Sequence, residues 1–283
     1  MLKRYLIVLI AILVTSLTYM NASLPAASGS VEKGRVESDS ESYSFVRKWG
    51  SEGTGDGQFQ RVHDLDFDPS EKYLFTVDRD GNRIQVFDKN GTFFFKWGSR
   101  GTDDGKFNVP YSVDVDAHGN VWVADRGNDR IQKFDKDGDF IFKFGSSGSK
   151  HGQFDNPRQV AVDEYVKFLY VVDSKNHRIQ KFYTNGTFIM SWGSLGKSEG
   201  KFDLPVTVII DGKGDIIVND RGNNRVQKFD TNGNFITKWG SYGKGDGEFK
   251  DPEHLAVDSQ GNVYVSDARN NNIQVFAPVN KTN

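Results

Sequence analysis

The residues in this sequence best suited to chemistry are histidines and carboxylates near the starts of repeated strands. His63 and Glu253 form the main candidate pair, with Asp66 as a further oxygen ligand. An imidazole beside a carboxylate can bind a divalent cation or transfer a proton near neutral pH. The alternative is that these side chains are polar because they line a wet opening. Nearby in the sequence lie Asp64, Asp114 and His254.

Composition excludes several classes of function. The 283 residues include no cysteine, which rules out disulfides, thiolate metal sites and a cysteine nucleophile. A formal net charge of -2 gives no whole-chain support for binding nucleic acid, although loop arginines at 79, 126, 221 and 269 make one face mildly positive. No phosphate-binding loop or G-x-S-x-G motif is present.

A repeat positions these residues. Five similar stretches begin at aspartates spaced 47, 48, 47 and 47 residues apart, and one of them reads DRGNDRIQKFD from Asp125. Each period contains four short runs with alternating polarity, separated by turn residues such as Gly, Asn and Asp. Four strands in about 45 residues are typical of a propeller blade.

The leading aspartate and an arginine five residues later recur in the copies. The carboxylate can accept N–H groups of a loop while the guanidinium holds the other end of the loop, so we expect a structural role. The last copy has Asn272 in place of the arginine. The predicted structural residues are Asp78, Arg83, Asp125, Arg130, Asp173, Arg178, Asp220, Arg225 and Asp267.

The sequence predicts an all-β fold, a five-bladed propeller of four-stranded antiparallel blades. The periodic region begins with a run at 44–49 that aligns with a fourth strand, and it ends at 273–276, which aligns with a third strand. We therefore expect the N-terminal strand to complete the last blade and close the ring. Six blades are the alternative.

The run VWVADRGNDRIQKFD, followed by Gly and FKFG, resembles the NHL repeat, and the other copies match as well. The resemblance implies a propeller, more often six-bladed. It also implies three kinds of function: binding of proteins or RNA, catalysis by a zinc amidating lyase, and catalysis by related bacterial lyases and lactonases.

In the peptidyl-hydroxyglycine amidating lyase, three zinc-binding histidines follow the proline that starts the first strand of a blade. Only His63 matches that pattern, so the resemblance to this enzyme lacks its zinc site. The corresponding positions, which we expect at the mouth of the channel, are His63, Tyr111, Arg158, Val206 and Glu253.

The N-terminus indicates export. Lys3 and Arg4 precede an apolar run, as in a signal peptide or a membrane anchor at 1–22. A Ser- and Glu-rich linker at 23–43, the propeller at 44–279 and a tail at 280–283 complete the expected organisation.

The sequence predicts a secreted or surface-tethered monomeric propeller that binds an extracellular protein, peptide or glycan, without nucleic acid, cofactor or catalysis. The alternative is a metal-assisted lyase or hydrolase with His63 and Glu253 as catalytic residues. In that case a zinc or calcium ion would be bound by His63, Glu253 and Asp66.

Overall fold

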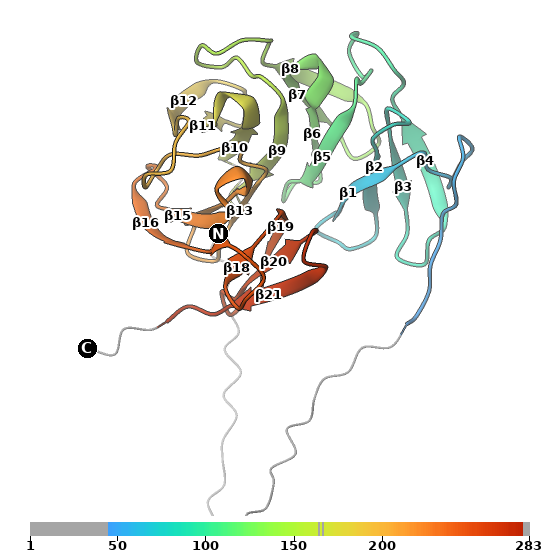
Figure 1. Cartoon of the computed structure of the whole chain (residues 1–283). Helices are drawn as coiled ribbons and strands as arrows, with labels where there is room; N and C mark the ends of the chain where they lie inside the picture. Colours follow the sequence, from blue (N-terminus) through green and yellow to red (C-terminus); the bar gives the residue numbers. More distant parts are fainter. Residues whose placement is uncertain (1–44, 164, 166, 280–283) are drawn as a thin grey trace, which may run out of the picture. The chain divides into compact units, whose positions relative to one another are not determined.

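The structure is a computed structural model that describes residues 45–163, 165 and 167–279. The described part is an all-β propeller of five antiparallel blades (Figure 1), which confirms the predicted fold class. The expected signal segment, linker and tail lie outside the described residues. Across the described ranges, no helix has the length and apolar character needed to cross a membrane.

The strands of each blade follow one another in sequence order, from the centre of the ring outward. The innermost strands are β1 (Val62–Phe67), β5 (Pro110–Val115), β9 (Pro157–Val162), β13 (Thr207–Ile210) and β19 (Pro252–Val257). The second strands are β2 (Leu74–Asp78), β6 (Val121–Asp125), β10 (Phe168–Asp173), β14 (Ile216–Asp220) and β20 (Val263–Asp267). The third strands are β3 (Arg83–Phe87), β7 (Arg130–Phe134), β11 (Arg178–Tyr183), β15 (Arg225–Phe229) and β21 (Asn272–Phe276).

Four blades have an outer strand, and short elements connect the rest. The outer strands are β4 (Phe93–Trp97), β8 (Phe140–Phe144), β12 (Phe188–Trp192) and β16 (Phe235–Trp239). A parallel two-residue pair, β17 (Ser241–Tyr242) and β18 (Glu248–Phe249), lies in the loop before the last blade. The 3₁₀ turns are η1 (Arg126–Asn128), η2 (Ser174–Asn176) and η3 (Arg221–Asn223).

Aromatic rings at the ends of the outer strands hold neighbouring blades together. The ring of Trp97 lies 5.5 Å from that of Phe134 in the next blade, and Phe144 lies 4.8 Å from Phe182. Large rings fill the wedge between two twisted sheets, which is the role the sequence predicted. Trp49 precedes the first blade and contacts it in the same way, with its ring 6.3 Å from that of Phe87.

The recurring aspartate and arginine lie in direct contact and fix the glycine-rich loop. The Nε of Arg130 donates to Asp125 over 2.7 Å, and its terminal nitrogens donate to the carbonyls of Thr102, Asp103 and Lys106. Asp125 also accepts the N–H of Asn108 at 2.8 Å. The other three pairs, Asp78–Arg83, Asp173–Arg178 and Asp220–Arg225, have separations of 2.9, 2.7 and 2.7 Å.

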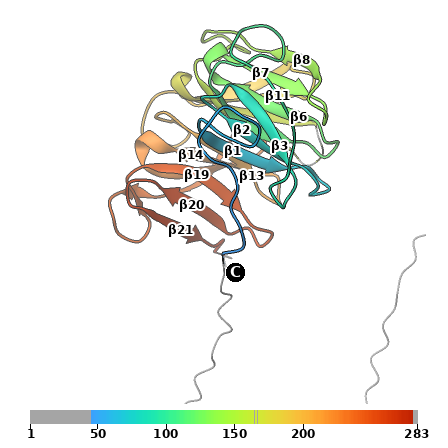
Figure 2. The same ribbon diagram turned by 90° about the vertical axis from the view of Figure 1, so that its right-hand side faces the viewer.

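The expected closure of the ring by the N-terminal strand is not formed in this structure. Residues 45–50 are exposed and have no strand pairing, and the last blade contains three strands, β19, β20 and β21. In Figure 2, β21 forms the outer edge of that blade. Trp49 packs on Phe87 and Arg47 bonds to Asn90, so the segment is docked on the first blade. Trp97 makes the equivalent contact with Phe134 while β4 still pairs with β3. The physical reason is therefore that β21 and the first blade do not pack together, which leaves the segment unable to contact both.

The ring is consequently open between the last blade and the first. Leu65 on β1 is 54% exposed, whereas its counterpart Val113 on β5, covered by the preceding blade, is 4% exposed. Ile273 on β21 is 68% exposed, whereas its counterpart Ile131 on β7 is fully buried. Each face of the opening therefore exposes apolar side chains whose counterparts elsewhere in the ring are buried by a neighbouring blade.

Candidate functional site

The innermost strands are joined by side chains that bind the backbone of the next blade. Parallel neighbours around a channel leave N–H groups without a ladder partner, and a short polar side chain can satisfy them. The acceptors for the amides of Val113, Val160 and Val208 are Asp64 at 3.1 Å, Ser112 at 3.2 Å and Gln159 at 3.1 Å. These three polar side chains of the channel lining therefore have a structural role.

A second layer of this lining contains two carboxyl groups that touch. Asp66 accepts the N–H of Val115 at 2.8 Å, Asp114 accepts that of Val162 at 2.6 Å, and the two side chains are hydrogen-bonded to each other. Burial raises the pKa of both, and the charge of Asp66 raises that of Asp114 further. Because the two carboxyl groups are adjacent, ionisation of one makes ionisation of the other less favourable.

Burial also raises the pKa of Asp64, to about 7. The N–H groups of Val113 and Leu65 oppose this shift but do not overcome it. Asp64, Asp66 and Asp114 therefore carry less negative charge at neutral pH than their number suggests. The reduced negative charge makes these carboxyl groups weaker ligands for a cation.

His63 lies at the mouth of the channel against Tyr111 and His254. Its ring centroid is 3.7 Å from that of Tyr111 and 6.1 Å from that of His254. Burial, together with His254, lowers the pKa of His63 to about 4, and burial also lowers the pKa of His254. Both imidazoles are therefore neutral at pH 7.

Glu253 does not form the expected pair with His63. Its carboxylate lies 3.1 Å from the guanidinium of Arg221, which is also bound to Asp251 at 2.6 Å. Among the described residues, no group of three or more His, Asp or Glu side chains could hold a metal ion. The alternative metal set of His63, Glu253 and Asp66 is thus not assembled here.

Tyr111 lies at the centre of a cluster of arginines. The guanidinium carbons of Arg126, Arg158 and Arg79 lie 4.9, 5.3 and 5.8 Å from the centroid of its ring. These three residues are called the arginine cluster below. Arg158 was expected at the mouth from its strand position. Arg79 and Arg126 come from the loops after β2 and β6, and the signal that could have placed them was the recurrence of arginine after the leading aspartate.

Part of the arginine cluster has no hydrogen-bond partner. The Nε and one terminal nitrogen of Arg158 are buried and unbonded, as is the Nε of Arg79, which lies 3.6 Å from Asp80. The Nε of Arg126 donates to Asn156 at 2.7 Å. Burial, together with the charges of Arg158 and Arg79, lowers the pKa of Arg126. The cluster is therefore held under mutual repulsion.

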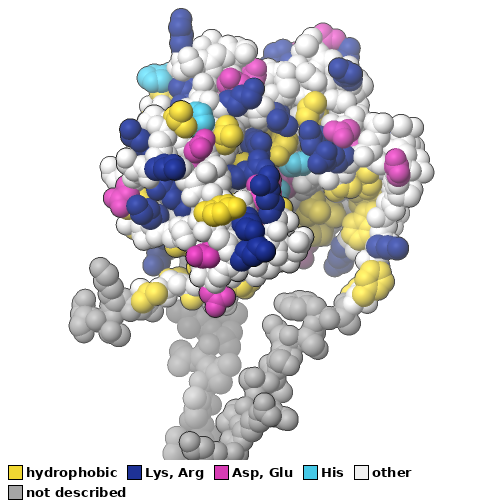
Figure 3. Space-filling view, in the orientation of Figure 1, with side chains coloured by type: hydrophobic (Ala, Val, Ile, Leu, Met, Phe, Trp, Pro, Cys, Tyr) yellow, Lys and Arg dark blue, Asp and Glu magenta, His cyan; other side chains and the backbone are white. Residues whose placement is uncertain are grey.

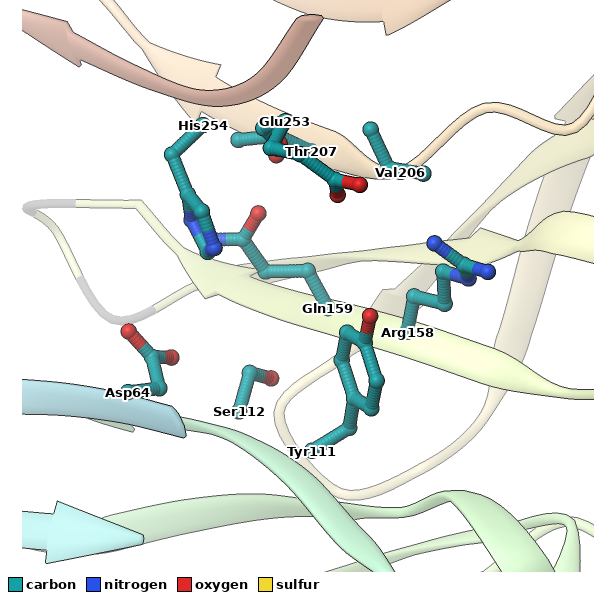
Figure 4. Close-up of a pocket in the computed structure, with 9 residues that line it drawn as sticks. All are labelled: Asp64, Tyr111, Ser112, Arg158, Gln159, Val206, Thr207, Glu253 and His254. Carbon is teal, nitrogen blue, oxygen red and sulfur yellow. The ribbon is translucent and has the colours of Figure 1, made fainter. Parts of the chain in front are cut away.

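Arg158 and Tyr111 border an open depression of about 230 Å³, a volume that includes space open to solvent, together with Glu253 and His254. Figure 4 shows the Tyr111 hydroxyl, the Arg158 guanidinium and the Glu253 carboxylate directed toward one region. Val206, which is 4% exposed, forms an apolar part of the wall. Figure 3 shows Lys and Arg side chains gathered across the middle of one face of the propeller.

Comparisons with known proteins support the fold. Residues 107–134 match the NHL repeat, and residues 205–277 match a family described as a 6-bladed beta-propeller. The chain is therefore a β-propeller that contains an NHL repeat. The described residues form five blades, whereas the family described as 6-bladed agrees with the alternative count of six. A comparison with curated proteins gives no match.

Several solved structures share the architecture at low sequence identity. A streptogramin B lyase is 13% identical with a TM-score of 0.58, over 77% of this chain and 70% of the other. A catalytically inactive virginiamycin B lyase from Staphylococcus aureus with quinupristin is 10% identical, with a TM-score of 0.56 over 77% and 70%. Hydrazine synthase from Kuenenia stuttgartiensis is 12% identical, with a TM-score of 0.52 over 77% and 84%.

At these identities the likeness concerns the fold alone. The distant similarity to the amidating lyase is not shown by these comparisons. Neighbours with different activities share one scaffold, so function must be argued from the site.

Proposed function

We propose that this protein is an exported or surface-tethered propeller that binds a protein, peptide or glycan at the mouth of its channel and performs no catalysis. One observation supports this most. The residues common to the copies, such as Asp125 and Arg130, make bonds within the fold, whereas residues that differ between copies meet at one opening. Tyr111, Arg158 and Glu253 are the residues of this second kind.

The test compares full-length proteins immobilised as bait for the extracellular fraction of the source cells. The bait variant combines Tyr111→Ala with Arg158→Gln, and the control is Arg269→Gln, because Arg269 is exposed. We expect a component that the wild type and the control retain and the mouth variant loses. Equal retention by the mouth variant, with its fold verified by circular dichroism, contradicts the proposal.

The second candidate is a metal-assisted lyase or hydrolase. It is favoured by the proximity of His63 and His254, whose lowered pKa values keep both imidazoles in the neutral form that binds metals. It is disfavoured by the pairing of Glu253 with Arg221. Stoichiometric zinc or calcium in the purified protein, lost in His63→Ala, would support this candidate against the binding function.

A further inference from the structure

The arginine cluster brings three positive charges to one aromatic ring without a matching set of negative charges. Arg79 lies 3.6 Å from Asp80, while Arg126 and Arg158 have no carboxylate within 4 Å among the described residues. Arg221 is the instructive contrast, since Asp251 and Glu253 neutralise it at the same mouth. Like charges that lack counter-charges at a half-buried site cost free energy, so a function is needed to explain them.

Some N–H groups of the arginine cluster have no hydrogen-bond acceptor, which points to a ligand. Buried guanidinium nitrogens in proteins are normally bonded, and an unbonded one costs free energy. Two nitrogens of Arg158 are buried and unbonded beside the depression that Arg158 helps to line. In contrast, the structural Arg130 uses its Nε and both of its terminal nitrogens within the fold.

The chemistry that would satisfy this arrangement is that of an oxyanion. Carboxylate and phosphate oxygens accept charge-assisted bonds from guanidinium groups, often two at once. The guanidinium carbons of Arg126 and Arg158 lie 4.9 and 5.3 Å from the centroid of the Tyr111 ring, within the range of a cation–π interaction.

We propose that Arg79, Arg126 and Arg158 form a binding site for an oxyanion group, a carboxylate or a phosphate, carried by the ligand of the propeller. This inference rests on the proposed binding function and names the chemical group that the mouth recognises. Binding of the group relieves the repulsion among the three arginines and supplies acceptors for the free N–H groups of Arg158. Glu253 stays bound to Arg221 and leaves the cluster positive.

The test is calorimetric titration of the full-length protein with two small probes, inorganic phosphate and malonate, at constant ionic strength set with sodium chloride. Wild type is compared with Arg158→Gln, with Arg158→Lys and with the exposed control Arg269→Gln. We expect saturable binding of at least one probe, weakened about tenfold or more in Arg158→Gln because charge-assisted bonds to a guanidinium are lost. The control should bind as the wild type does, and Arg158→Lys should recover part of the affinity.

The two probes distinguish the sources of the oxyanion. Preference for phosphate assigns a phosphoryl ligand, and preference for malonate assigns a carboxylate ligand. Absence of saturable binding of both probes to the wild type overturns the inference, and so does equal weakening in Arg269→Gln. If the bait experiment still succeeds in that case, the mouth binds its partner through other chemistry, and the proposed function stands without the oxyanion site.

Discussion

Arginines in this propeller fall into two groups that differ in what surrounds them. Arg83, Arg130, Arg178 and Arg225 each bind the leading aspartate of their blade and the carbonyls of a loop. Arg126 and Arg158 instead lie against Tyr111, and two nitrogens of Arg158 are unbonded. The first group serves the fold. We propose that the second group binds a ligand, so the two groups should respond differently to substitution.

The first prediction concerns Asp64. Its folded pKa of about 7 lies above the ordinary aspartate pKa of 3.8, so the folded state binds more protons than the unfolded state between these pH values. The free energy of unfolding contributed by this group is therefore full at low pH and falls as pH rises toward 7. Asp64→Asn keeps an acceptor for Val113 and removes the ionisation. The difference between the two pKa values corresponds to at most about 4 kcal/mol, so we expect Asp64→Asn to stabilise the protein by on the order of 1–4 kcal/mol at pH 8.

The measurement is urea unfolding of wild type and Asp64→Asn at several pH values. The stability difference should grow from pH 4 to pH 7 and then level off. His63 contributes with the opposite sign, since its pKa is lowered to about 4, but it is present in both proteins and largely cancels. A difference that is independent of pH would show that Asp64 ionises normally in the folded protein.

The sequence predicted only some of the residues that line the channel mouth. Tyr111, Arg158 and Glu253 were identified from their place after the start of the first strand. Their partners could be predicted only in part. The recurrence of arginine after the leading aspartate marks Arg79, Arg126 and Arg221, but which neighbour each one meets depends on loops of different blades in the assembled ring. Glu253 was expected beside His63, but Arg221 attracts it more strongly because a guanidinium is charged and a buried imidazole at neutral pH is not.

At the scale of elements, the segment before β1 makes the side-chain contact expected of an outer strand without the expected strand pairing. Its alignment with an outer strand was correct in one respect, because Trp49 contacts Phe87 as Trp97 contacts Phe134. Pairing with β21 was not realised. Repetition in the sequence identifies equivalent residues, but whether the two ends of the ring meet depends on the summed geometry of all blades.

The second prediction follows from this contact. Trp49→Ala removes the ring that covers Phe87 and should destabilise the propeller by about 1–2 kcal/mol, less than for a fully buried tryptophan because Trp49 is 38% exposed. The control Val46→Ala changes a side chain that is 73% exposed and should have little effect. Equal stabilities for wild type and Trp49→Ala in urea unfolding would mean that the segment is not docked on the first blade.

At the scale of the whole propeller, the period gave the number of blades and the order of strands correctly. Interior packing follows from the same repeat, since Ile84, Ile131, Ile179 and Val226 occupy one equivalent position and are all fully buried. The opening between the last and first blades was not predictable, because Ile273 belongs to this set in the sequence and is nevertheless 68% exposed. The burial of this position depends on contact with the next blade, and the repeat in the sequence does not show whether the first blade packs against the last one.

The third prediction tests this opening with a matched pair of variants. Ile131→Lys places a charge inside the ring and should cost more than about 3 kcal/mol. Ile273→Lys makes the same change at the equivalent exposed position and should alter stability by about 0.5 kcal/mol or less. Thermal unfolding of both variants checks this. Similar losses in the two variants would indicate that the ring is closed in solution.

The central claim is that the arginines at the channel mouth bind a ligand, whereas the arginines paired with the leading aspartates stabilise the fold. The most direct measurement is the unfolding free energy of Arg158→Gln and Arg130→Gln in the absence of added oxyanions. Arg130→Gln should lose about 3 kcal/mol or more, because it leaves the buried Asp125 without its partner. Arg158→Gln should unfold like the wild type or be more stable, since it removes repulsion and unbonded donors. Comparable destabilisation by both substitutions would contradict the claim.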